Sequence, residues 1–414
     1  MKKTILFATL ALALGSAQAG NLLPAGAGDQ QPTRLVAAPL PAGDFERQPV
    51  SVAWPMDPRA QLSAPAPHQA ESREYWSTVE AAELQAGFAI DTTAPGALVR
   101  LSPAGAPVAA AGAGRPTAAV DPSQLRVLRN GRLVAQPQAL AQRANTEQLR
   151  QAGMDVPAGT AIVQLEPALG QGRFQLQLPR AEGRYLVHVY EPRSPHVLKA
   201  QADRTRVLAG ESFEVSAALQ DGGRPMRGAR LEGQLVSPTG EVFPLGFRNG
   251  KAVASLPEDV GTGPGLWEVQ LFAGAATPGG PVQRDARTAI EVSRPTARLA
   301  GGYGFDAASL AFRLPVQVAA PGRYELRGVL YATSPAGQLV PVAQAHSANW
   351  FEPGRGSLDL AFGPANLPMG YGAPFELRQL ELKDQTRMGT LETRELALRE
   401  DKPRAGRPGR GFGR

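Results

Sequence analysis

The 414-residue sequence contains no cysteine and only four histidines, and aromatic residues make up 6% of the chain. Without cysteine there can be no disulfide framework, thiolate-ligated zinc or iron–sulfur site, thiol nucleophile or lipid-bearing cysteine. Familiar enzyme motifs are missing too: the chain has no Gly-x-Ser-x-Gly, His-Glu-x-x-His, EF-hand or Walker A pattern. The sequence therefore predicts no catalytic residue, no cofactor and no metal site.

Long apolar runs are also lacking, and the one short run stands at the N-terminus. Lys2 and Lys3 precede an apolar core at 5–14, which ends in the small-x-small sequence Ala17-Gln18-Ala19. This pattern predicts a Sec signal peptide over residues 1–19 that is cleaved after Ala19. A retained membrane anchor is the weaker alternative, because the run is too short to span a bilayer and no stop-transfer pattern follows. We therefore expect a periplasmic or secreted protein without a transmembrane segment.

Over most of the chain, neither positive nor negative charge is in clear excess. Of the formal charge of +6, the two lysines of the signal peptide contribute two and the five basic residues after Asp401 contribute five. Residues 20–401 therefore carry a formal charge of −1. A nearly neutral body gives no reason to expect nucleic acid as a partner.

Glycine and proline, in contrast, are abundant, with 46 and 38 residues. This composition excludes a collagen, a coiled coil or a helical bundle as the main architecture. Apolar residues alternate with polar ones in many short runs, and turn signals such as Asn249-Gly250 separate the runs. The longest alternating run contains Leu310, Phe312, Leu314, Val316 and Val318. The pattern predicts an all-β protein of tandem immunoglobulin-like β-sandwich domains.

One segment favours a helix. Residues 137–152 begin with Pro137, carry Leu140, Ala144 and Leu149 at roughly helical spacing, and stop before Gly153. We expect one short helix there, which covers an open end of the N-terminal domain.

Prolines interrupt the strand pattern near 192–198 and 293–298, where we place domain boundaries. Residues 20–70 show no sustained period and predict an extended Pro/Ala-rich arm with one short strand around Val50–Trp54. The expected organisation is a signal peptide at 1–19, the arm at 20–70, an N-terminal β domain at 71–197, an immunoglobulin-like sandwich at 198–293, a C-terminal sandwich at 294–398 and a disordered basic tail at 399–414.

Several segments are similar to a secreted gammaproteobacterial family of unknown function. These are Ser72–Trp76, Thr93–Arg100 and Glu191–Pro195, and, towards the C-terminus, Pro321–Thr333 with Ala373–Asp384 resembles β modules of exported bacterial proteins. The likeness runs from about residue 70 to residue 398. It implies an N-terminal β domain followed by immunoglobulin-like modules in an exported protein. The family carries no established activity, so the resemblance assigns no catalytic residue.

The titratable residues do not form a recognisable site. His188 and His196 are the closest pair of histidines, and Glu191 is the only carboxylate between them. Zinc needs three or four converging ligands, so exposed or strand-face histidines are the favoured interpretation. The acid pairs Glu71/Glu74 and Glu80/Glu83 are too close in sequence to face each other across a cleft, and we expect them on a solvated polar face.

The candidate binding residues are aromatic and basic. Trp350 and Phe351 precede a Glu-Pro-Gly turn, and Tyr371 stands between two glycines in an expected loop. Loops of β-sandwiches bind ligands, so these rings predict stacking on a sugar or peptide; burial in the core or between domains is the competing interpretation. The basic tail adds an electrostatic contribution or only solubility. Its candidate residues are Arg404, Arg407 and Arg410.

We therefore expect an exported, non-enzymatic protein that binds or scaffolds an envelope protein or glycan. Two alternatives stay open. One is a hydrolase, or an accessory subunit of one, in which acids converge with His188 or His346. The other is a purely architectural spacer of stacked β domains. The sequence does not indicate an oligomeric state.

Overall fold

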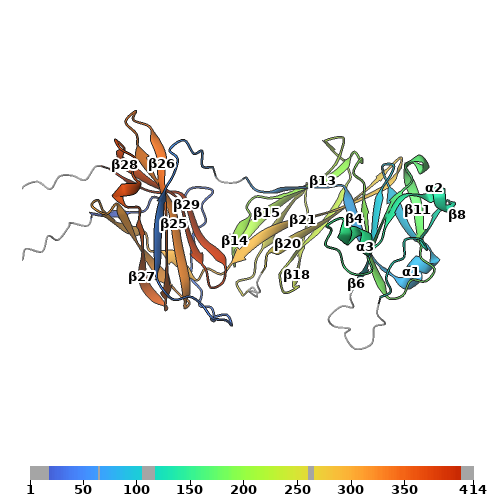
Figure 1. Cartoon of the computed structure of the whole chain (residues 1–414), viewed down its shortest axis with the longest axis horizontal. Helices are drawn as coiled ribbons and strands as arrows, with labels where there is room; N and C mark the ends of the chain where they lie inside the picture. Colours follow the sequence, from blue (N-terminus) through green and yellow to red (C-terminus); the bar gives the residue numbers. More distant parts are fainter. Residues whose placement is uncertain (1–17, 64–65, 105–116, 260–264, 402–414) are drawn as a thin grey trace, which may run out of the picture.

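The computed structural model describes residues 18–63, 66–104, 117–259 and 265–401. These residues form three lobes in a row, and each lobe consists of two sheets around one hydrophobic core (Figure 1). Strands dominate, and the described residues contain only three short α-helices. The all-β prediction is therefore confirmed. Most of the predicted signal peptide and the basic tail with Arg404, Arg407 and Arg410 lie outside the described residues.

The first lobe packs two antiparallel sheets around a core that includes Val99, Leu101, Phe174 and Tyr185. Its strands are β4 (Glu74–Glu80), β5 (Phe88–Thr92), β6 (Leu98–Ala104), β7 (Arg126–Arg129), β8 (Arg132–Leu133), β9 (Leu140–Ala144), β10 (Ala161–Leu165), β11 (Gly172–Gln177) and β12 (Arg184–Tyr190). One sheet has the order β4-β12-β6-β10-β9 and the other β5-β11-β7-β8. Strand β4 is thus an edge strand, and it faces the middle lobe.

The prediction of a single helix over 137–152 is wrong. The segment contains α2 (Gln136–Ala139), strand β9 and α3 (Thr146–Gln151), and a third helix, α1 (Ala81–Ala86), lies elsewhere in the lobe. The backbone of β9 pairs with β10, which interrupts any helix. Asn145 then starts α3, because its side chain accepts a hydrogen bond of 3.0 Å from the Gln148 N–H. Tertiary pairing therefore overrides the weak helical spacing.

The middle lobe has a core that includes Phe213, Val215, Trp267 and Val269. Its strands are β3 (Gln69–Ser72), β13 (His196–Ala202), β14 (Arg206–Leu208), β15 (Ser212–Asp221), β16 (Arg224–Pro225), β17 (Arg230–Val236), β18 (Val242–Leu245), β19 (Lys251–Ser255), β20 (Trp267–Thr277) and β21 (Gly280–Ser293). One sheet has the order β16-β15-β13-β3, with β19 also on β15, and the other has the order β14-β21-β20-β17-β18.

The third lobe contains both ends of the described chain. Its strands are β1 (Gln18–Asn21), β2 (Val50–Pro55), β22 (Ala297–Leu299), β23 (Gly302–Asp306), β24 (Ala311–Val318), β25 (Gly322–Thr333), β26 (Leu339–Phe351), β27 (Gly354–Ala361), β28 (Gly372–Asp384) and β29 (Gly389–Glu400). One sheet has the order β1-β23-β24-β22, with β27 on β24, and the other has the order β2-β26-β25-β28-β29.

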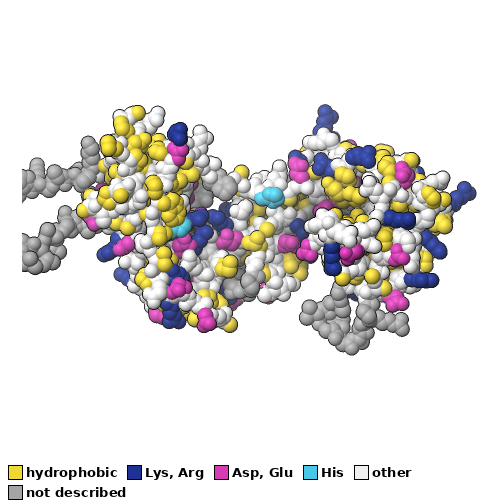
Figure 2. Space-filling view, in the orientation of Figure 1, with side chains coloured by type: hydrophobic (Ala, Val, Ile, Leu, Met, Phe, Trp, Pro, Cys, Tyr) yellow, Lys and Arg dark blue, Asp and Glu magenta, His cyan; other side chains and the backbone are white. Residues whose placement is uncertain are grey.

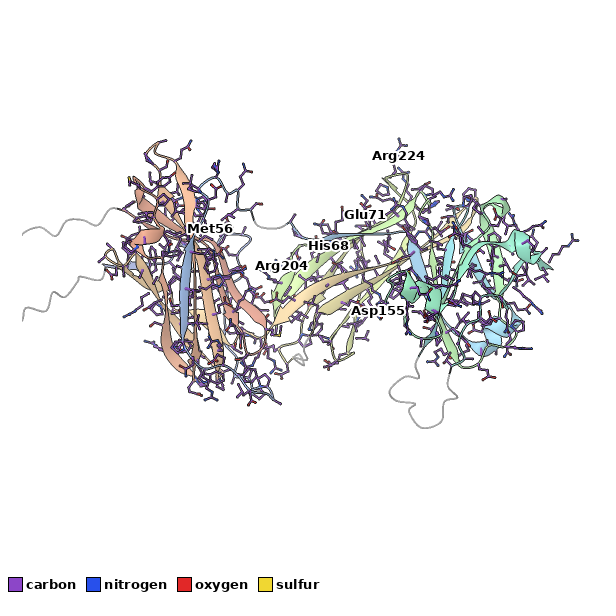
Figure 3. All side chains as sticks on the ribbon, viewed as in Figure 1. Met56, His68, Glu71, Asp155, Arg204 and Arg224 are labelled. Atoms are coloured by element: carbon purple, nitrogen blue, oxygen red, sulfur yellow. The ribbon has the colours of Figure 1, made fainter. Side chains whose placement is uncertain are left out.

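The N-terminal segment 20–70 belongs to two lobes. Strand β1 pairs with β23 and β2 pairs with β26, so the start of the chain lies in the third lobe. Strand β3 then pairs with β13 in the middle lobe before β4 begins the first lobe. Figure 3 shows this path, with Met56 at the third lobe and His68 and Glu71 along the middle lobe. The chain therefore runs through all three lobes in one direction and returns through them in the other.

The return path connects the middle and third lobes by polar contacts. The Glu291 Oε1 atom, near the end of β21, accepts a hydrogen bond of 2.6 Å from the Thr390 N–H of β29. Arg206 lies 3.4 Å from Glu291 and 3.3 Å from Glu381 of β28. Elsewhere on the molecule, acidic and basic side chains are interspersed over the face that Figure 2 displays. This mixture agrees with the nearly neutral charge of residues 20–401.

We predict that a chain beginning at Asp57 is less stable and aggregates more readily than one beginning at Gly20. The shorter chain loses the remaining residues of β1, Gly20 and Asn21, and all of β2, which exposes the edges of β23 and β26. An unpaired strand edge is a template for association with another chain. Thermal unfolding with light scattering measures both effects. A chain that ends at Asp401 is the matched control and should behave as the full chain does. Equal unfolding temperatures and scattering for all three chains would contradict the prediction.

Candidate functional site

A buried ion pair joins the first and middle lobes. The Arg284 Nη2 atom, on β21, lies 2.7 Å from the Oε2 atom of Glu191, which follows β12, and both side chains are fully buried. Arg284 occupies an inward position of its strand, between Val282 and Ala286. Desolvation lowers the pKa of Arg284 from its ordinary value, and the Glu191 carboxylate opposes this shift.

Hydrogen bonds satisfy the rest of the pair. The Arg284 guanidinium also donates to the hydroxyls of Thr93, at 2.8 Å, and Ser194, at 2.7 Å. The Glu191 carboxylate accepts from the backbone N–H groups of Thr93 and Ala94. Buried charges are tolerated when they are paired and fully hydrogen-bonded. We refer to Thr93, Glu191, Ser194 and Arg284 as the Arg284 network.

The Arg284 network brings together two segments that are far apart in sequence. Thr93 belongs to the segment 93–100 and Glu191 to the segment 191–195, both of which carry the family resemblance. In the structure these two segments meet around the arginine of β21. Both segments therefore help to attach the first lobe to the middle lobe.

Asp285, the next residue on β21, holds the edge of the first lobe. Its Oδ2 atom accepts a hydrogen bond of 2.9 Å from the backbone N–H of Trp76 on β4. An edge strand has unpaired N–H groups, and Asp285 satisfies one of them. Desolvation raises the pKa of Asp285 from its ordinary 3.8 to about 6, although the Trp76 N–H favours the charged form.

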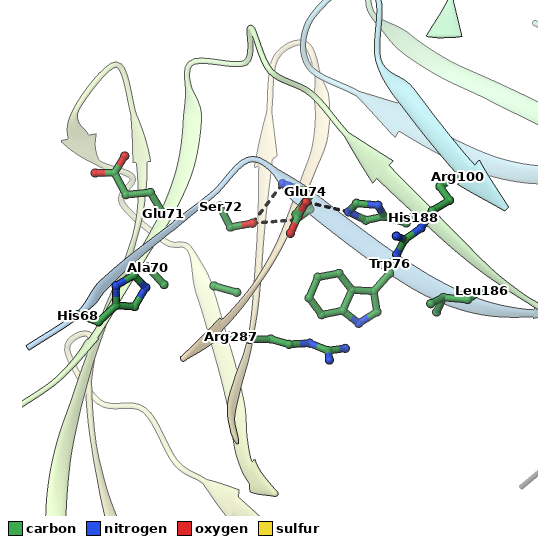
Figure 4. Close-up of a pocket in the computed structure, with 11 residues that line it drawn as sticks. His68, Ala70, Glu71, Ser72, Glu74, Trp76, Arg100, Leu186, His188 and Arg287 are labelled. Carbon is green, nitrogen blue, oxygen red and sulfur yellow. Dashed lines mark hydrogen bonds and ion pairs between the residues drawn. The ribbon is translucent and has the colours of Figure 1, made fainter. Parts of the chain in front are cut away.

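A groove of about 680 Å³ opens beside this contact (Figure 4). Strands β4, β12 and β6 of the first lobe form one wall, and β3 and β21 of the middle lobe contribute to the other. Trp76, His188 and Arg100 lie in register across the first three strands, so their side chains share one face of the sheet. The side chains that give the groove its chemistry are His68, Glu74, Trp76, Arg100, His188 and Arg287.

Cations and a tryptophan ring lie close together in this groove. The Arg287 guanidinium stands 4.3 Å from the centroid of the Trp76 ring. His188 Nε2 and Glu74 Oε2 are 2.8 Å apart, and this hydrogen bond lowers the pKa of Glu74 from its usual value. Glu74 is therefore ionised at neutral pH, and its carboxylate is hydrogen-bonded to His188. The arrangement can bind a polar ligand through one aromatic surface and several hydrogen-bonding groups.

The aromatic residues predicted for binding do not lie in one place. Trp350 and Phe351 end strand β26 and are not loop residues, because the strand continues to the Glu-Pro-Gly turn. Phe45 lies 6.4 Å from Trp350, ring centroid to ring centroid, and the Arg47 guanidinium stands 4.3 Å from the Trp350 ring. Trp350 therefore packs against the N-terminal segment, which sequence reasoning placed in a separate arm.

Phe351 and Tyr371 pack against the core of the third lobe. Phe351 pairs with Gly322 at one end of β25, whereas the residue after Tyr371, Gly372, pairs with Thr333 at the other end. The 12 residues of β25 separate these ends by about 36 Å. Trp350 and Tyr371 therefore cannot contact the same small ligand.

His188 and His196, the closest pair of histidines in the sequence, have different partners. In the described part of the chain, no group of three or more metal-ligating side chains is placed to hold an ion. His188 pairs with Glu74, whereas the His196 Nε2 atom lies 3.9 Å from Asp221. Among residues 18–401 where the structure is described, no helix is long and apolar enough to cross a membrane.

Sequence reasoning missed Trp76, Arg100 and Arg284 as members of one region. A signal for Arg284 was present, since an arginine at an inward position of an alternating strand requires a buried partner. The groove had no such signal. Strands β3 and β4 follow one another in the chain, but β6, β12 and β21 are far apart in sequence. Only strand pairing and the packing of the lobes bring these strands to one groove.

We predict that Glu191→Gln lowers the free energy of unfolding by about 3–5 kcal/mol, because the variant leaves Arg284 charged and buried without its counter-ion. Denaturant unfolding, followed by tryptophan fluorescence, measures the loss. Asp359→Asn is the matched control, because Asp359 pairs with Arg313 at a distance of 2.9 Å on the exposed surface, where such a pair contributes less than about 1 kcal/mol. Similar losses for the two variants would refute the role of the Arg284 network.

We predict that Asp285→Asn raises the free energy of unfolding above that of the wild type by more at pH 7.5 than at pH 4. The raised pKa of Asp285 means that the folded state binds its proton more tightly than the unfolded state. The contribution of Asp285 to the stability of the wild type therefore falls as the pH rises from about 4 through 6. This decrease is absent from the variant, whose amide oxygen still accepts from Trp76. Urea unfolding at several pH values gives the difference. If the free energies of unfolding of variant and wild type differed by the same amount at every pH, the prediction would be contradicted.

Comparisons with known proteins agree with this architecture. A family model described as the N-terminal domain of a domain of unknown function (DUF4785) matches residues 41–191, and the model of its C-terminal domain matches residues 296–399. The crystal structure of a DUF4785 family protein from Legionella pneumophila is similar, with a TM-score of 0.70 and 20% identity over 92% of this chain and 99% of that one. No curated protein matches.

Two other solved structures are far less similar. A putative membrane anchored protein from Corynebacterium diphtheriae has a TM-score of 0.15 at 11% identity, over 85% of this chain and 91% of that chain. The alpha-2-macroglobulin of E. coli has a TM-score of 0.17 at 12% identity, over 86% of this chain and 23% of that chain. Neither supports an argument about fold. The two DUF4785 models together match more than half of the sequence, and the chain belongs to the DUF4785 family.

Proposed function

We propose that this protein is an exported, non-enzymatic binding protein of the cell envelope, and that it holds an envelope glycan in the groove between the first and middle lobes. The observation that carries the proposal is the half-buried ring of Trp76 in a groove lined by charged and hydrogen-bonding side chains. A tryptophan ring offers a large apolar surface to the apolar face of a sugar, while polar neighbours bind its hydroxyls. The N-terminal signal pattern supports export.

The groove suits this role better than the aromatic residues of the third lobe. Trp76 lies in a groove among several polar side chains, whereas Trp350 and Tyr371 lie towards opposite ends of β25 and cannot act together on one ligand. The groove also requires both lobes, so a binding role explains why they are held by a buried ion pair. We take the middle lobe to be immunoglobulin-like, with a supporting role as the second wall of the groove.

A hydrolase is the second candidate. Glu74, with its lowered pKa, and Asp285, with its pKa raised to about 6, flank Trp76. Two carboxyl groups with such different pKa values can act as base and acid. However, Asp285 lines a second groove of about 370 Å³ and not the one that Glu74 faces. This separation favours binding over hydrolysis, because a glycosidase needs both carboxyl groups across one cleft.

We predict that Trp76→Ala weakens binding to purified peptidoglycan sacculi or lipopolysaccharide at least tenfold, whereas Trp350→Ala leaves it unchanged. Removing the indole of Trp76 deletes the one aromatic surface of the groove. Co-sedimentation measures binding to sacculi, and titration with fluorescent lipopolysaccharide measures binding to that glycan. Circular dichroism checks that both variants fold.

Equal binding by Trp76→Ala and the wild type to every glycan tested would refute the proposed site. The same incubations report hydrolysis. Release of soluble sugar by the wild type, and its loss in Glu74→Gln, would replace the binding role by the second candidate.

A further inference from the structure

Arg100 is a cation without a partner in the groove. Its Nε atom is buried and has no hydrogen bond, and no ion pair is found for its guanidinium in the described part of the chain. A buried donor without an acceptor destabilises the folded state, and more so when the group is charged. The Nε atom is closed to solvent, so a ligand in the groove would pair with the guanidinium through its two terminal nitrogens.

The register of the sheet explains why no side chain pairs with Arg100. Strand β6 is flanked by β12 and β10, which place His188 on one side of Arg100 and Ile162 on the other. Neither neighbour is an acid. The acid that acts electrostatically on Arg100, Glu74, is hydrogen-bonded to His188 at 2.8 Å. Among the described residues, Glu74 therefore acts on this guanidinium only at a distance, and no carboxylate forms an ion pair with it.

A second guanidinium lies on the other side of the tryptophan. In Figure 4, Arg100 and Arg287 approach Trp76 from opposite sides, one from the first lobe and one from the middle lobe. Arg287 is 3.3 Å from Glu268 and 4.3 Å from the Trp76 ring centroid, so its position is fixed by the protein itself. Arg100 is thus the group that is open to a ligand, and Arg287 adds a positive field beside it.

We propose that Arg100 binds an oxyanion carried by a sugar, either a carboxylate or a phosphate, while that sugar lies against Trp76. This inference rests on the proposed function and makes it more specific: the groove prefers an acidic glycan to a neutral one. The guanidinium is suited to this task because its planar array of N–H donors matches two oxygens of a carboxylate or phosphate.

The test compares a hexameric oligogalacturonate with its fully methyl-esterified form, which has the same length and no charge. Isothermal titration measures both dissociation constants for the full mature chain. We expect the acid to bind at least tenfold more tightly than the ester. Arg100→Gln should remove this preference, and Arg100→Lys should restore part of it. A phosphorylated oligosaccharide in a second series tells whether phosphate or carboxylate is the better anion.

Arg126→Gln is the matched control, because it removes the same charge from an exposed position of the same lobe, on strand β7 of the other sheet. It should bind both probes as the wild type does. Thermal unfolding adds a second readout. Since Arg100 has no partner to lose, Arg100→Gln should unfold at the same temperature as the wild type or higher, while a structural role predicts a lower temperature.

The outcomes separate this inference from the proposed function. If Trp76→Ala weakens binding to both probes but Arg100→Gln leaves the preference for the acid intact, the glycan site stands and the role of Arg100 is refuted. If neither probe nor the phosphorylated oligosaccharide binds while sacculi do, the inference also fails and the proposed function survives. Failure of the wild type to bind any glycan overturns both.

Discussion

The arrangement of the first two lobes depends on burying one arginine. Arg284 is charged and fully buried, so it requires a carboxylate and several hydrogen-bond acceptors. The carbonyls of His196 and Gln283 in the middle lobe accept two of its hydrogen bonds, whereas the carboxylate of Glu191 and the hydroxyl of Thr93 come from the first lobe. The position of the first lobe is therefore specified by electrostatics as well as by apolar packing. Glu191 and Thr93 satisfy the arginine only when both of their segments reach β21 together.

The groove follows from the same constraint. Arg284 and Asp285 are adjacent on β21 and face opposite sides of the strand, so one fixes the first lobe through Glu191 and the other through the Trp76 backbone. Once β4 is held in this way, the face that bears Trp76 stands beside Arg287. The chain also passes from β3 of the middle lobe directly into β4 of the first lobe, which is a second covalent connection between these two lobes. His68, just before β3, lines the groove. The attachment of the lobes and the proposed recognition of a glycan thus depend on neighbouring residues of one strand.

Much of the fold could be predicted from the sequence, because period-two patterns are local. The run from Leu310 to Val318 indicates β24, and Asn249-Gly250 indicates a tight turn before β19. The helix over 137–152 was mispredicted since its spacing is weak and the pairing of β9 with β10 is a tertiary effect. Of the site, the sequence suggested only that an acid could converge with His188, as Glu74 does. Trp76, Arg100 and Arg287 are neighbours only because a strand from each of two lobes meets there, and no local pattern encodes that meeting.

Amide hydrogen exchange tests most directly whether the Arg284 network holds the lobes together. The most informative amide is that of Trp76, whose N–H bonds to Asp285 across the junction. The amides of Thr93 and Ala94 bond within the first lobe to Glu191, the carboxylate that pairs with Arg284 of the middle lobe. The account predicts that they exchange as slowly as the core amide of Val269 in β20, because the junction opens only when the protein unfolds. Exchange of these three amides at the rate of the exposed loops, with Val269 still protected, would contradict it.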